Sequence, residues 1–308
     1  MSEKPAKVIP EKVIGYQLPN TVQSYKPSGP ILYALGIGFS TDPLNKTDLT
    51  FTYELNDEFR VFPTYATSFL DISAVGEAVS NCPGLPEFNP MQLLHGMHTL
   101  EFHKPLKAEA TYYQKAYLED IQDKEKGALL LVRFDSFEDK EYKSLAVTNK
   151  MFLFIRGLGG YDPQKKHKPL VSTDFPPIPK TAPTFATQQG TTKNQALIFR
   201  LNGDFNPLHA DPSMAEVGGF PAPILHGLCT YGITAKLAIE KASDYDLTAV
   251  EKVSTKFVGH IFPGETISLK GWLSSDQKTV IFEANVVERN KQIAVGFVVF
   301  KKQLKPKL

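Results

Sequence analysis

The sequence is poor in cysteine, with only Cys82 and Cys229 among its 308 residues. Two thiols cannot make a disulfide framework, so a reducing compartment is expected. Long apolar runs are missing as well. The longest apolar stretches, such as 127–132 and 293–300, have the length of a strand and are far too short to span a bilayer. The N-terminal residues MSEKPAKVIPEK are polar and charged and lack the apolar centre of a secretory signal.

An excess of charge of either sign is also absent. The chain has 34 Lys and Arg against 33 Asp and Glu, a net charge of +1, so neither a nucleic-acid partner nor a surface for anionic membranes is expected. Membrane insertion is not expected either, because long apolar runs are missing. No glycine-rich dinucleotide-binding loop is present. With 42% hydrophobic and 22% charged residues, the composition is that of a globular protein with one large or two medium domains.

The sequence contains an internal duplication, offset by about 150 residues. Each copy has a strand, a proline-containing bend and a second strand, then an alternating strand, then a final apolar strand. These segments are 99–111, 129–137 and 144–155 in the first copy, and 255–268, 279–287 and 292–300 in the second. In the second alternating strand, Val280, Phe282, Ala284 and Val286 should share one face of a sheet.

The segment Tyr161–Thr184 separates the two copies. It contains six prolines and the basic run Lys165–Lys168. Proline removes backbone donors, so this segment is predicted to be a linker, and its basic run a solvated loop. The predicted domains are therefore 1–160 and 185–308, joined by residues 161–184.

Each half also contains a long helix candidate ahead of its sheet. Ile224–Lys241 is apolar over much of its circumference and follows Pro221 and Pro223, and Tyr65–Val79 is the candidate in the first half. A hydrophobic helix wrapped by an antiparallel sheet is the hotdog arrangement. The predicted fold class is α+β, a double hotdog in which two tandem units pack as an internal pseudo-dimer.

Chemistry is concentrated in residues 199–215, FRLNGDFNPLHADPSMA. We expect a strand, a turn at Asn202-Gly203, a tight loop through Asn206-Pro207, and a short helix. Asp211 would be the N-cap of that helix and Pro212 its first residue, with Gly218 ending it.

This loop presents Asp204, Asn206 and His209 from a proline-fixed turn. A carboxylate and an imidazole five residues apart can converge on one water, which Asp204 can deprotonate while His209 orients it and carries charge. Downstream, His226-Gly227 lies at the start of the apolar helix, where free N–H groups can stabilise an enolate oxygen. Taken singly, each residue is more often a turn former or a core residue; their combination favours a catalytic site.

The motifs RLNGDFNPLHADP (200–212) and FPAPILHGLCT (220–230) resemble the type 2 enoyl-CoA hydratases. These are MaoC-like dehydratases, including the hydratase part of the peroxisomal multifunctional enzyme type 2. Segments 30–38, 59–64 and 93–100 resemble the double-domain eukaryotic members.

The resemblance implies hydration of trans-2-enoyl-CoA to (3R)-3-hydroxyacyl-CoA in fatty-acid β-oxidation, by a homodimer. It implies that Asp204 and His209 are the catalytic pair, that Asn206 helps to hold the water, and that Gly227 provides the oxyanion hole. The first half lacks D-x-N-P-x-H and would be a degenerate copy that accommodates the acyl chain. No metal or redox cofactor is implied, since coenzyme A is part of the substrate. Candidate substrate contacts are His226, Phe257, Lys256, Arg200 and Lys180, the last three for phosphates.

The C-terminal tripeptide Pro306-Lys307-Leu308 resembles the Ser-Lys-Leu peroxisomal targeting signal. We therefore expect a peroxisomal location, with the cytoplasm as the alternative.

Three other interpretations are weaker. His95-x-x-His98, with Glu101 and His103, suggests a metal site, but no thiolate or second spaced pair supports it. A hotdog acyl-CoA thioesterase would direct the same water at C1 and release free thiol. A non-catalytic acyl-CoA-binding protein would not need both Asp204 and His209.

Overall fold

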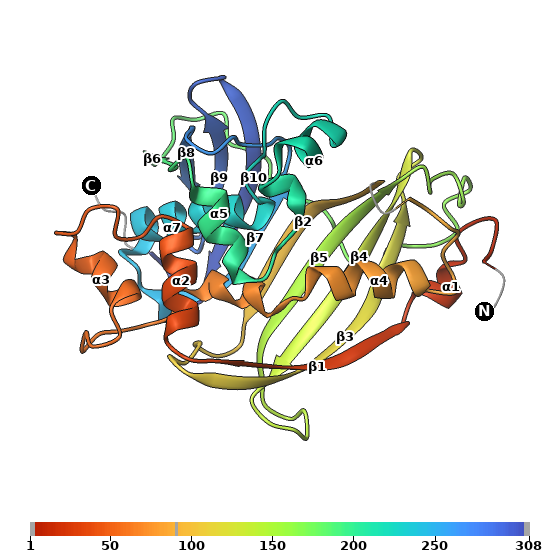
Figure 1. Cartoon of the computed structure of the whole chain (residues 1–308), viewed down its shortest axis with the longest axis horizontal. Helices are drawn as coiled ribbons and strands as arrows, with labels where there is room; N and C mark the ends of the chain where they lie inside the picture. The colour runs from red at the N-terminus through yellow and green to blue at the C-terminus, as the bar shows by residue number, and fades with distance from the viewer. Residues whose placement is uncertain (1–3, 90–91, 305–308) are drawn as a thin grey trace.

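A computed structural model describes residues 4–89 and 92–304. Ten antiparallel strands form one sheet in the order β1-β3-β4-β5-β2-β7-β10-β9-β8-β6 (Figure 1). The strands are β1 Gln17–Tyr25, β2 Leu93–Phe102, β3 Ala110–Asp123, β4 Gly127–Phe137, β5 Leu145–Arg156, β6 Phe185–Gly190, β7 Val250–Phe257, β8 Thr266–Leu273, β9 Thr279–Val286 and β10 Lys291–Phe300. The α-helices are α1 Pro10–Val13, α2 Ser28–Gly36, α3 Lys46–Thr52, α4 Ile72–Asn81, α5 Gln195–Phe199, α6 Pro212–Val217 and α7 Gly227–Ser243.

The strand order confirms the duplication. Outward from the centre of the sheet, the first half runs β2-β5-β4-β3-β1 and the second half runs β7-β10-β9-β8-β6. Each strand of the first half therefore has a counterpart at the same place in the second half. The halves join through β2 and β7, whose pairs run from Met97–Lys256 to Glu101–Lys252. Thr99 and Ser254 form the central pair, and their hydroxyls lie 2.7 Å apart in the buried interior. A local two-fold axis therefore passes near this pair, as the predicted pseudo-dimer requires.

Alternation along the strands defines an inner and an outer face of the sheet. Val280, Phe282, Ala284 and Val286 are all fully buried, as predicted, and they belong to the core around α7. On the outer face, a smaller apolar cluster is formed by Met97, Leu129, Leu131 and Phe152.

The long helix predicted over Ile224–Lys241 is confirmed, but both of its ends lie later in the chain, since α7 covers Gly227–Ser243. α7 begins at Gly227, because the Leu225 N–H donates to the Ile261 carbonyl (2.7 Å) and holds the preceding residues extended. All residues from Leu228 to Ile239 are buried, so the helix is enclosed on every side.

The continuous first-half helix predicted over Tyr65–Val79 is wrong. A 3₁₀ helix, η1, covers Pro63–Phe69, and α4 begins afresh at Ile72. The break falls at Leu70 and Asp71, both of which have extended backbones. The Asp71 side chain accepts from the Ala74 N–H (3.0 Å), so this carboxylate caps a new helix rather than continuing the old one.

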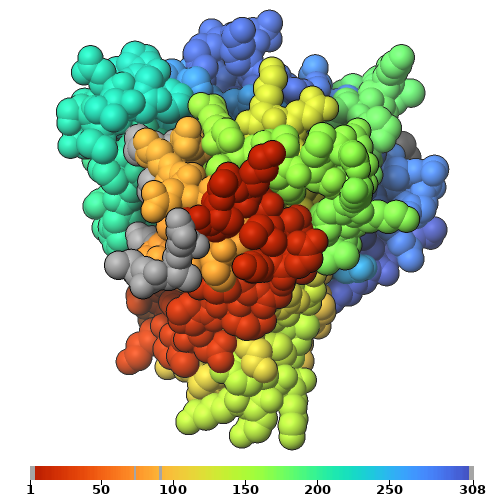
Figure 2. Space-filling model, turned by 90° about the vertical axis from the view of Figure 1, so that its right-hand side faces the viewer, coloured from red at the N-terminus to blue at the C-terminus, as the bar shows by residue number. Residues whose placement is uncertain are grey.

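Residues 157–184, between β5 and β6, contain no helix or strand, in keeping with their prolines. The start of this segment is tied to the β3–β4 turn, because the Gly160 and Asp162 N–H groups donate to the Asp123 carboxylate (2.9 and 2.7 Å). In the space-filling view, green atoms of the chain after β5 lie beside the yellow and yellow-green atoms of β3 and β4 (Figure 2). Within the described ranges, no helix is both long and apolar enough to cross a membrane.

The two halves share the core around α7, whereas the first half also encloses a core of its own, which includes Val79, Leu118 and Ile155. Tyr33 of α2 and Tyr65 of η1, from the first half, belong to the same buried cluster as Tyr231 and Ile233 of α7. The first-half helices therefore cover the second-half helix.

Candidate active site

The predicted strand ahead of the catalytic loop is wrong, because residues 195–202 form α5 and a 3₁₀ turn. Buried Gln195 explains this: its side chain donates to the Gly36 carbonyl and accepts from the Thr192 N–H. These bonds fix the start of α5 against the end of α2. The chain then turns at Gly203 (φ 109°), a left-handed conformation that favours glycine, at the predicted Asn202-Gly203 turn.

The loop that follows is held by local hydrogen bonds. Asp204 Oδ1 accepts from the Asn206 N–H (3.3 Å), and Asn206 Oδ1 accepts from the Leu208 N–H (3.1 Å). A single 3₁₀ turn, η4 Pro207–His209, follows this loop and carries the His209 imidazole at its end. The next helix agrees with prediction: Asp211 caps α6 by accepting from Ser213 (2.9 Å), and the helix ends before Gly218.

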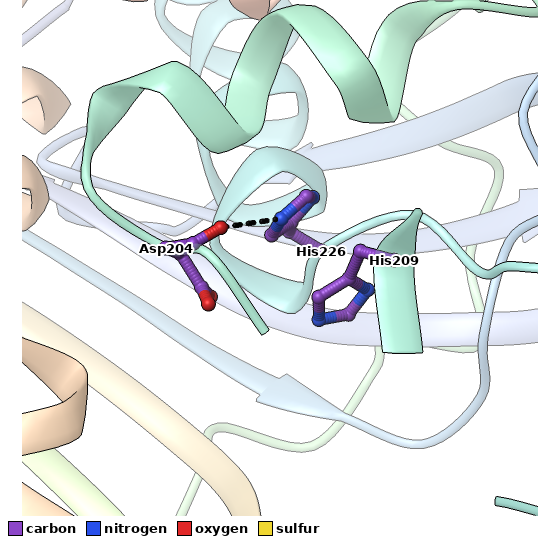
Figure 3. Close-up of side chains that lie close together, drawn as sticks. All are labelled: Asp204, His209 and His226. Atoms are coloured by element: carbon purple, nitrogen blue, oxygen red, sulfur yellow. Dashed lines mark hydrogen bonds between the residues drawn. The ribbon is translucent and has the colours of Figure 1, made fainter. Parts of the chain in front are cut away.

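Two neutral histidines meet beside this loop (Figure 3). His209 Nδ1 lies 2.8 Å from the Ile224 carbonyl oxygen, and His226 Nε2 lies 3.2 Å from the backbone carbonyl of Asp204. A carbonyl only accepts, so both of these nitrogens carry the ring hydrogen. His209 Nε2 is therefore the unprotonated nitrogen, free to accept a proton.

Burial favours the neutral form of both rings. It lowers the pKa of His209, while the Asp204 charge and the bond to the Ile224 carbonyl oppose the shift. Burial, with the neighbouring His209, lowers the pKa of His226 to about 3. The rings stack with centroids 3.8 Å apart, so a positive charge on one disfavours a charge on the other.

Ligand atoms of Asp204, His209 and His226 all lie within 4.8 Å of one another, close enough to suggest a metal ion. The geometry of the two imidazole rings does not fit a shared metal ion. Imidazole binds a metal along a lone pair in the ring plane, and two rings stacked at 27° cannot both aim such lone pairs at one ion. The arrangement favours proton transfer over metal coordination.

The metal alternative at His95 and His98 is also unsupported by geometry. Both residues lie on β2, a strand rather than a helix, and His98 Nδ1 lies 3.3 Å from His95 Nε2. His98 Nε2 lies 3.2 Å from the Asn149 side-chain oxygen. His103 Nε2 lies 3.3 Å from the Thr148 hydroxyl.

A cavity of about 800 Å³ opens beside the loop. Six of the predicted site residues line it, namely Asp204, Asn206, His209, Gly227, Lys256 and Phe257. His226 is fully buried behind His209. Arg200 and Lys180 do not line the cavity, and the Arg200 guanidinium instead lies 5.1 Å from the Phe205 ring.

Gly227 begins α7 at the wall of this cavity. A side chain added there would meet Phe257 only at an ordinary 3.7 Å, so packing within the protein does not require glycine. It would, however, occupy the space over the helix N-terminus, where free N–H groups point at a ligand.

Several cavity residues were not predicted, among them His95, Lys124 and Arg156. All three come from the first half. His95 lies in the His95-x-x-His98 pattern, which suggested a metal ligand instead of a substrate contact, and no local motif marks Lys124 or Arg156. Only the repeat, which predicts that the two sheets meet, could have directed attention to the ends of these strands.

Comparison with known proteins identifies both halves. Residues 23–157 match the MFE-2 hydratase 2 N-terminal domain, and residues 174–296 match the MaoC like domain. The chain is 36% identical to the Arabidopsis thaliana protein named peroxisomal enoyl-CoA hydratase 2, over 93% of each chain.

Comparison with solved structures supports the same family and fold. A MaoC-like dehydratase from Phytophthora capsici superposes with a TM-score of 0.85 at 31% identity, covering 96% of this chain and 98% of that one. A Mycobacterium tuberculosis protein described as a double hotdog fold superposes with a TM-score of 0.54 at 10% identity, covering 97% of each chain, which supports the fold alone. From this similarity along nearly its whole length, the chain belongs to the family of MaoC-like type 2 enoyl-CoA hydratases.

Proposed function

We propose that the protein reversibly hydrates trans-2-enoyl-CoA to (3R)-3-hydroxyacyl-CoA in fatty-acid β-oxidation. One observation carries the proposal: the unprotonated His209 Nε2, the Asp204 carboxylate and the N-terminus of α7 all face one cavity. Hydration needs these three parts, which are a base, a charge that stabilises the protonated base, and a donor for the developing oxyanion.

The reaction follows from these positions. The thioester oxygen accepts hydrogen bonds at Gly227, which makes C3 electrophilic. A water held by Asp204, His209 and Asn206 attacks C3 and gives one proton to His209 Nε2, while the C2–C3 π electrons move to the thioester oxygen. As the enolate collapses, that proton returns to C2 on the same face, so one water is added overall. Asp204, which the sequence predicts to deprotonate the water, instead stabilises the transient imidazolium in this scheme. The exchange of roles rests on the unprotonated His209 Nε2 and on the Asp204 charge, which opposes the lowered His209 pKa.

The first half would accommodate the acyl chain. It contributes the apolar wall residues Ile72, Leu93, Met151 and Leu153, and lacks the D-x-N-P-x-H motif. We assign residues 1–160 to this role, 161–184 to the linker and 185–308 to catalysis. Coenzyme A enters as part of the substrate, and the proposed reaction uses no further cofactor.

Purified protein with trans-2-decenoyl-CoA tests the proposal directly. Loss of enoyl-thioester absorbance is expected, and a coupled (R)-specific 3-hydroxyacyl-CoA dehydrogenase should oxidise the product. Asp204→Asn should lower kcat at least a hundredfold, roughly the contribution of a positioned acid–base group. Asp211→Asn is the matched control: it makes the same chemical change seven positions away, and asparagine caps a helix as well as aspartate does.

The alternatives predict different signals. Release of free thiol would indicate a thioesterase, and tight binding without absorbance loss would indicate a binding protein. Either result, or turnover that survives in Asp204→Asn, would contradict the proposal.

Two further assignments rest on similarity. A peroxisomal location is supported by the relative named as peroxisomal, whereas the predicted address Pro306-Lys307-Leu308 lies outside the described residues. A homodimer is implied by the family resemblance, and sedimentation equilibrium would test it.

A further inference from the structure

A second cavity, of about 170 Å³, opens at the other end of the β2–β7 strand pair. The pairing of these strands begins at Met97–Lys256, which lines the catalytic cavity. It ends at Glu101–Lys252, and just beyond that pair lie Phe102 and Val250, which line the second cavity. The two cavities therefore lie at opposite ends of one strand pair.

The local two-fold axis relates the walls of the two cavities. Phe102 and Phe257 each lie three residues after their member of the central pair, and Thr248 and Leu93 each lie six residues before theirs. Phe257 and Leu93 line the catalytic cavity. Phe102 and Thr248, at the equivalent positions, line the second cavity.

The segments ahead of the helices obey the same relation. Pro63 is the first residue of η1, as Gly227 is the first residue of α7. Arg60 lies three residues before Pro63 and lines the second cavity with it. Ile224 lies three residues before Gly227 and lines the catalytic cavity with it. The second cavity is therefore the first-half counterpart of the active site.

The wall of the second cavity suits binding rather than hydration. Among its described residues there is no histidine, and the one carboxylate, Asp246, is bonded to the Lys302 ammonium (2.5 Å) and to the Thr248 hydroxyl (2.7 Å). Pro63 has no N–H to donate at the place where Gly227 has one. The counterparts of the base and of the oxyanion donor are thus both replaced.

This wall is apolar inside and cationic toward solvent. Its buried residues are all apolar, namely Val61, Pro63, Phe102 and Val250. The half-buried Arg60 and the exposed Lys301 also line it, and neither pairs with a carboxylate within the described ranges. A third cation, Lys104, is neutralised by Glu138 at 2.7 Å. Two uncompensated positive charges beside an apolar interior suit an amphiphilic anion.

Arg60 is held in place by neutral groups. Its Nη1 donates to the Tyr245 carbonyl (3.0 Å), its Nε donates to the Thr50 hydroxyl (3.4 Å), and its guanidinium lies 4.9 Å from the centre of the Phe51 ring. Its Nη2 has no hydrogen-bond partner among the residues that the structure describes. A cation fixed in this way loses little freedom when it binds an anion.

We propose that the second cavity binds a carboxylate with a short apolar chain. The carboxylate would bond to Arg60 and Lys301, since a planar carboxylate matches the guanidinium fork, and the chain would lie against Phe102 and Val250. The cavity has roughly a fifth of the volume of the catalytic one, about 170 Å³ against 800 Å³, so it favours a short chain. This binding does not depend on the proposed hydratase function.

Hexanoate is the probe, and hexan-1-ol and acetate are the comparisons that lack its charge or its chain. Titration followed by ligand-observed NMR gives the Kd values, and native protein should bind hexanoate at least about tenfold more tightly than either comparison. Arg60→Gln should weaken hexanoate binding about tenfold, as expected for a lost hydrogen bond to a charged group. Lys301→Gln should weaken it about threefold, because Lys301 is exposed to solvent.

Lys291→Gln is the matched control, because Lys291 is an exposed lysine at the opposite end of β10 and lines neither cavity. It should keep the native Kd. The Lys301 variant keeps the test decisive if Arg60→Gln unfolds, since the Lys301 ammonium has no recorded bond within the described ranges. Equal Kd values for hexanoate and hexan-1-ol, or a native hexanoate Kd in Lys301→Gln, would overturn the inference.

Discussion

At the scale of single residues, the site works because its imidazoles are kept neutral. His209 offers Nε2 only while Nδ1 donates to the Ile224 carbonyl. A second pair of imidazoles is also kept neutral: the half-buried His95 contacts the buried His98, which in turn contacts the Asn149 side chain. Burial lowers the pKa of His95 to about 4, and burial with the neighbouring His95 takes the pKa of His98 well below its usual range.

These neutral histidines make stability depend on pH. In the unfolded chain each binds a proton near its ordinary pKa of 6.5, whereas His226 in the folded protein does so only near 3. The unfolded state therefore binds more protons between these values, and the free energy of unfolding should fall as pH drops below 6.5. The loss is at most about 1.4 kcal/mol per pH unit for each such histidine.

Urea unfolding at pH 7.5 and pH 5 measures the effect. His98→Gln should be less stable than native protein at pH 7.5 and should lose less on acidification, because it has one fewer buried imidazole to protonate. Equal losses in both proteins would show that His98 does not contribute.

At the scale of helices and strands, α7 packs directly on α2 through a glycine. A Cβ at Gly232 would lie 2.6 Å from the Tyr33 hydroxyl and from an Ile37 methyl group, too close for either helix to stay in place. Gly232→Ala should lower the free energy of unfolding by about 1–3 kcal/mol, although alanine is the better helix former.

Gly76→Ala in α4 is the matched comparison, because nothing lies within 4 Å of a Cβ there. It should stabilise the protein by up to about 1 kcal/mol. Chemical denaturation of both variants checks the pair, and destabilisation of equal size in the two would refute the packing argument.

Sequence periodicity predicted the repeated strands β4, β5, β9 and β10 well, but it missed β1 and β6 and predicted the helices less well. Alternation in β9 and the repeat itself depend on local pattern, which a single sequence displays directly. The break at Asp71 and the helix at 195–202 depend on partners elsewhere, such as the Gly36 carbonyl that holds Gln195.

The same distinction applies to the site. Asp204, His209 and Gly227 lie within 24 residues and form a readable motif, and the structure places all three on one cavity. Lys124 and Arg156 are brought to that cavity only by the pairing of β2 with β7, which no local pattern encodes.

At the scale of the whole molecule, the second half does not enclose its core alone. The buried cluster around α7 includes Tyr33, Phe62 and Tyr65 from the first half. We expect residues 185–308, expressed alone, to lack cooperative thermal unfolding, since this surface of α7 would be exposed to water. Circular dichroism and near-ultraviolet spectra would reveal the loss, and a sharp transition near that of the full chain would contradict the shared core.

The Thr99–Ser254 axis has a further consequence for how the protein can evolve. The local two-fold axis relates Glu101 to Lys256, because each lies two residues after its member of the central pair. In a dimer of identical chains, these equivalent positions would have to hold the same amino acid. Here Glu101 pairs with Lys150 and Lys252, while Lys256 faces the cavity. Fusion into one chain lets a mutation appear once instead of twice, so one side can specialise in chemistry while the other diverges to suit new acyl groups.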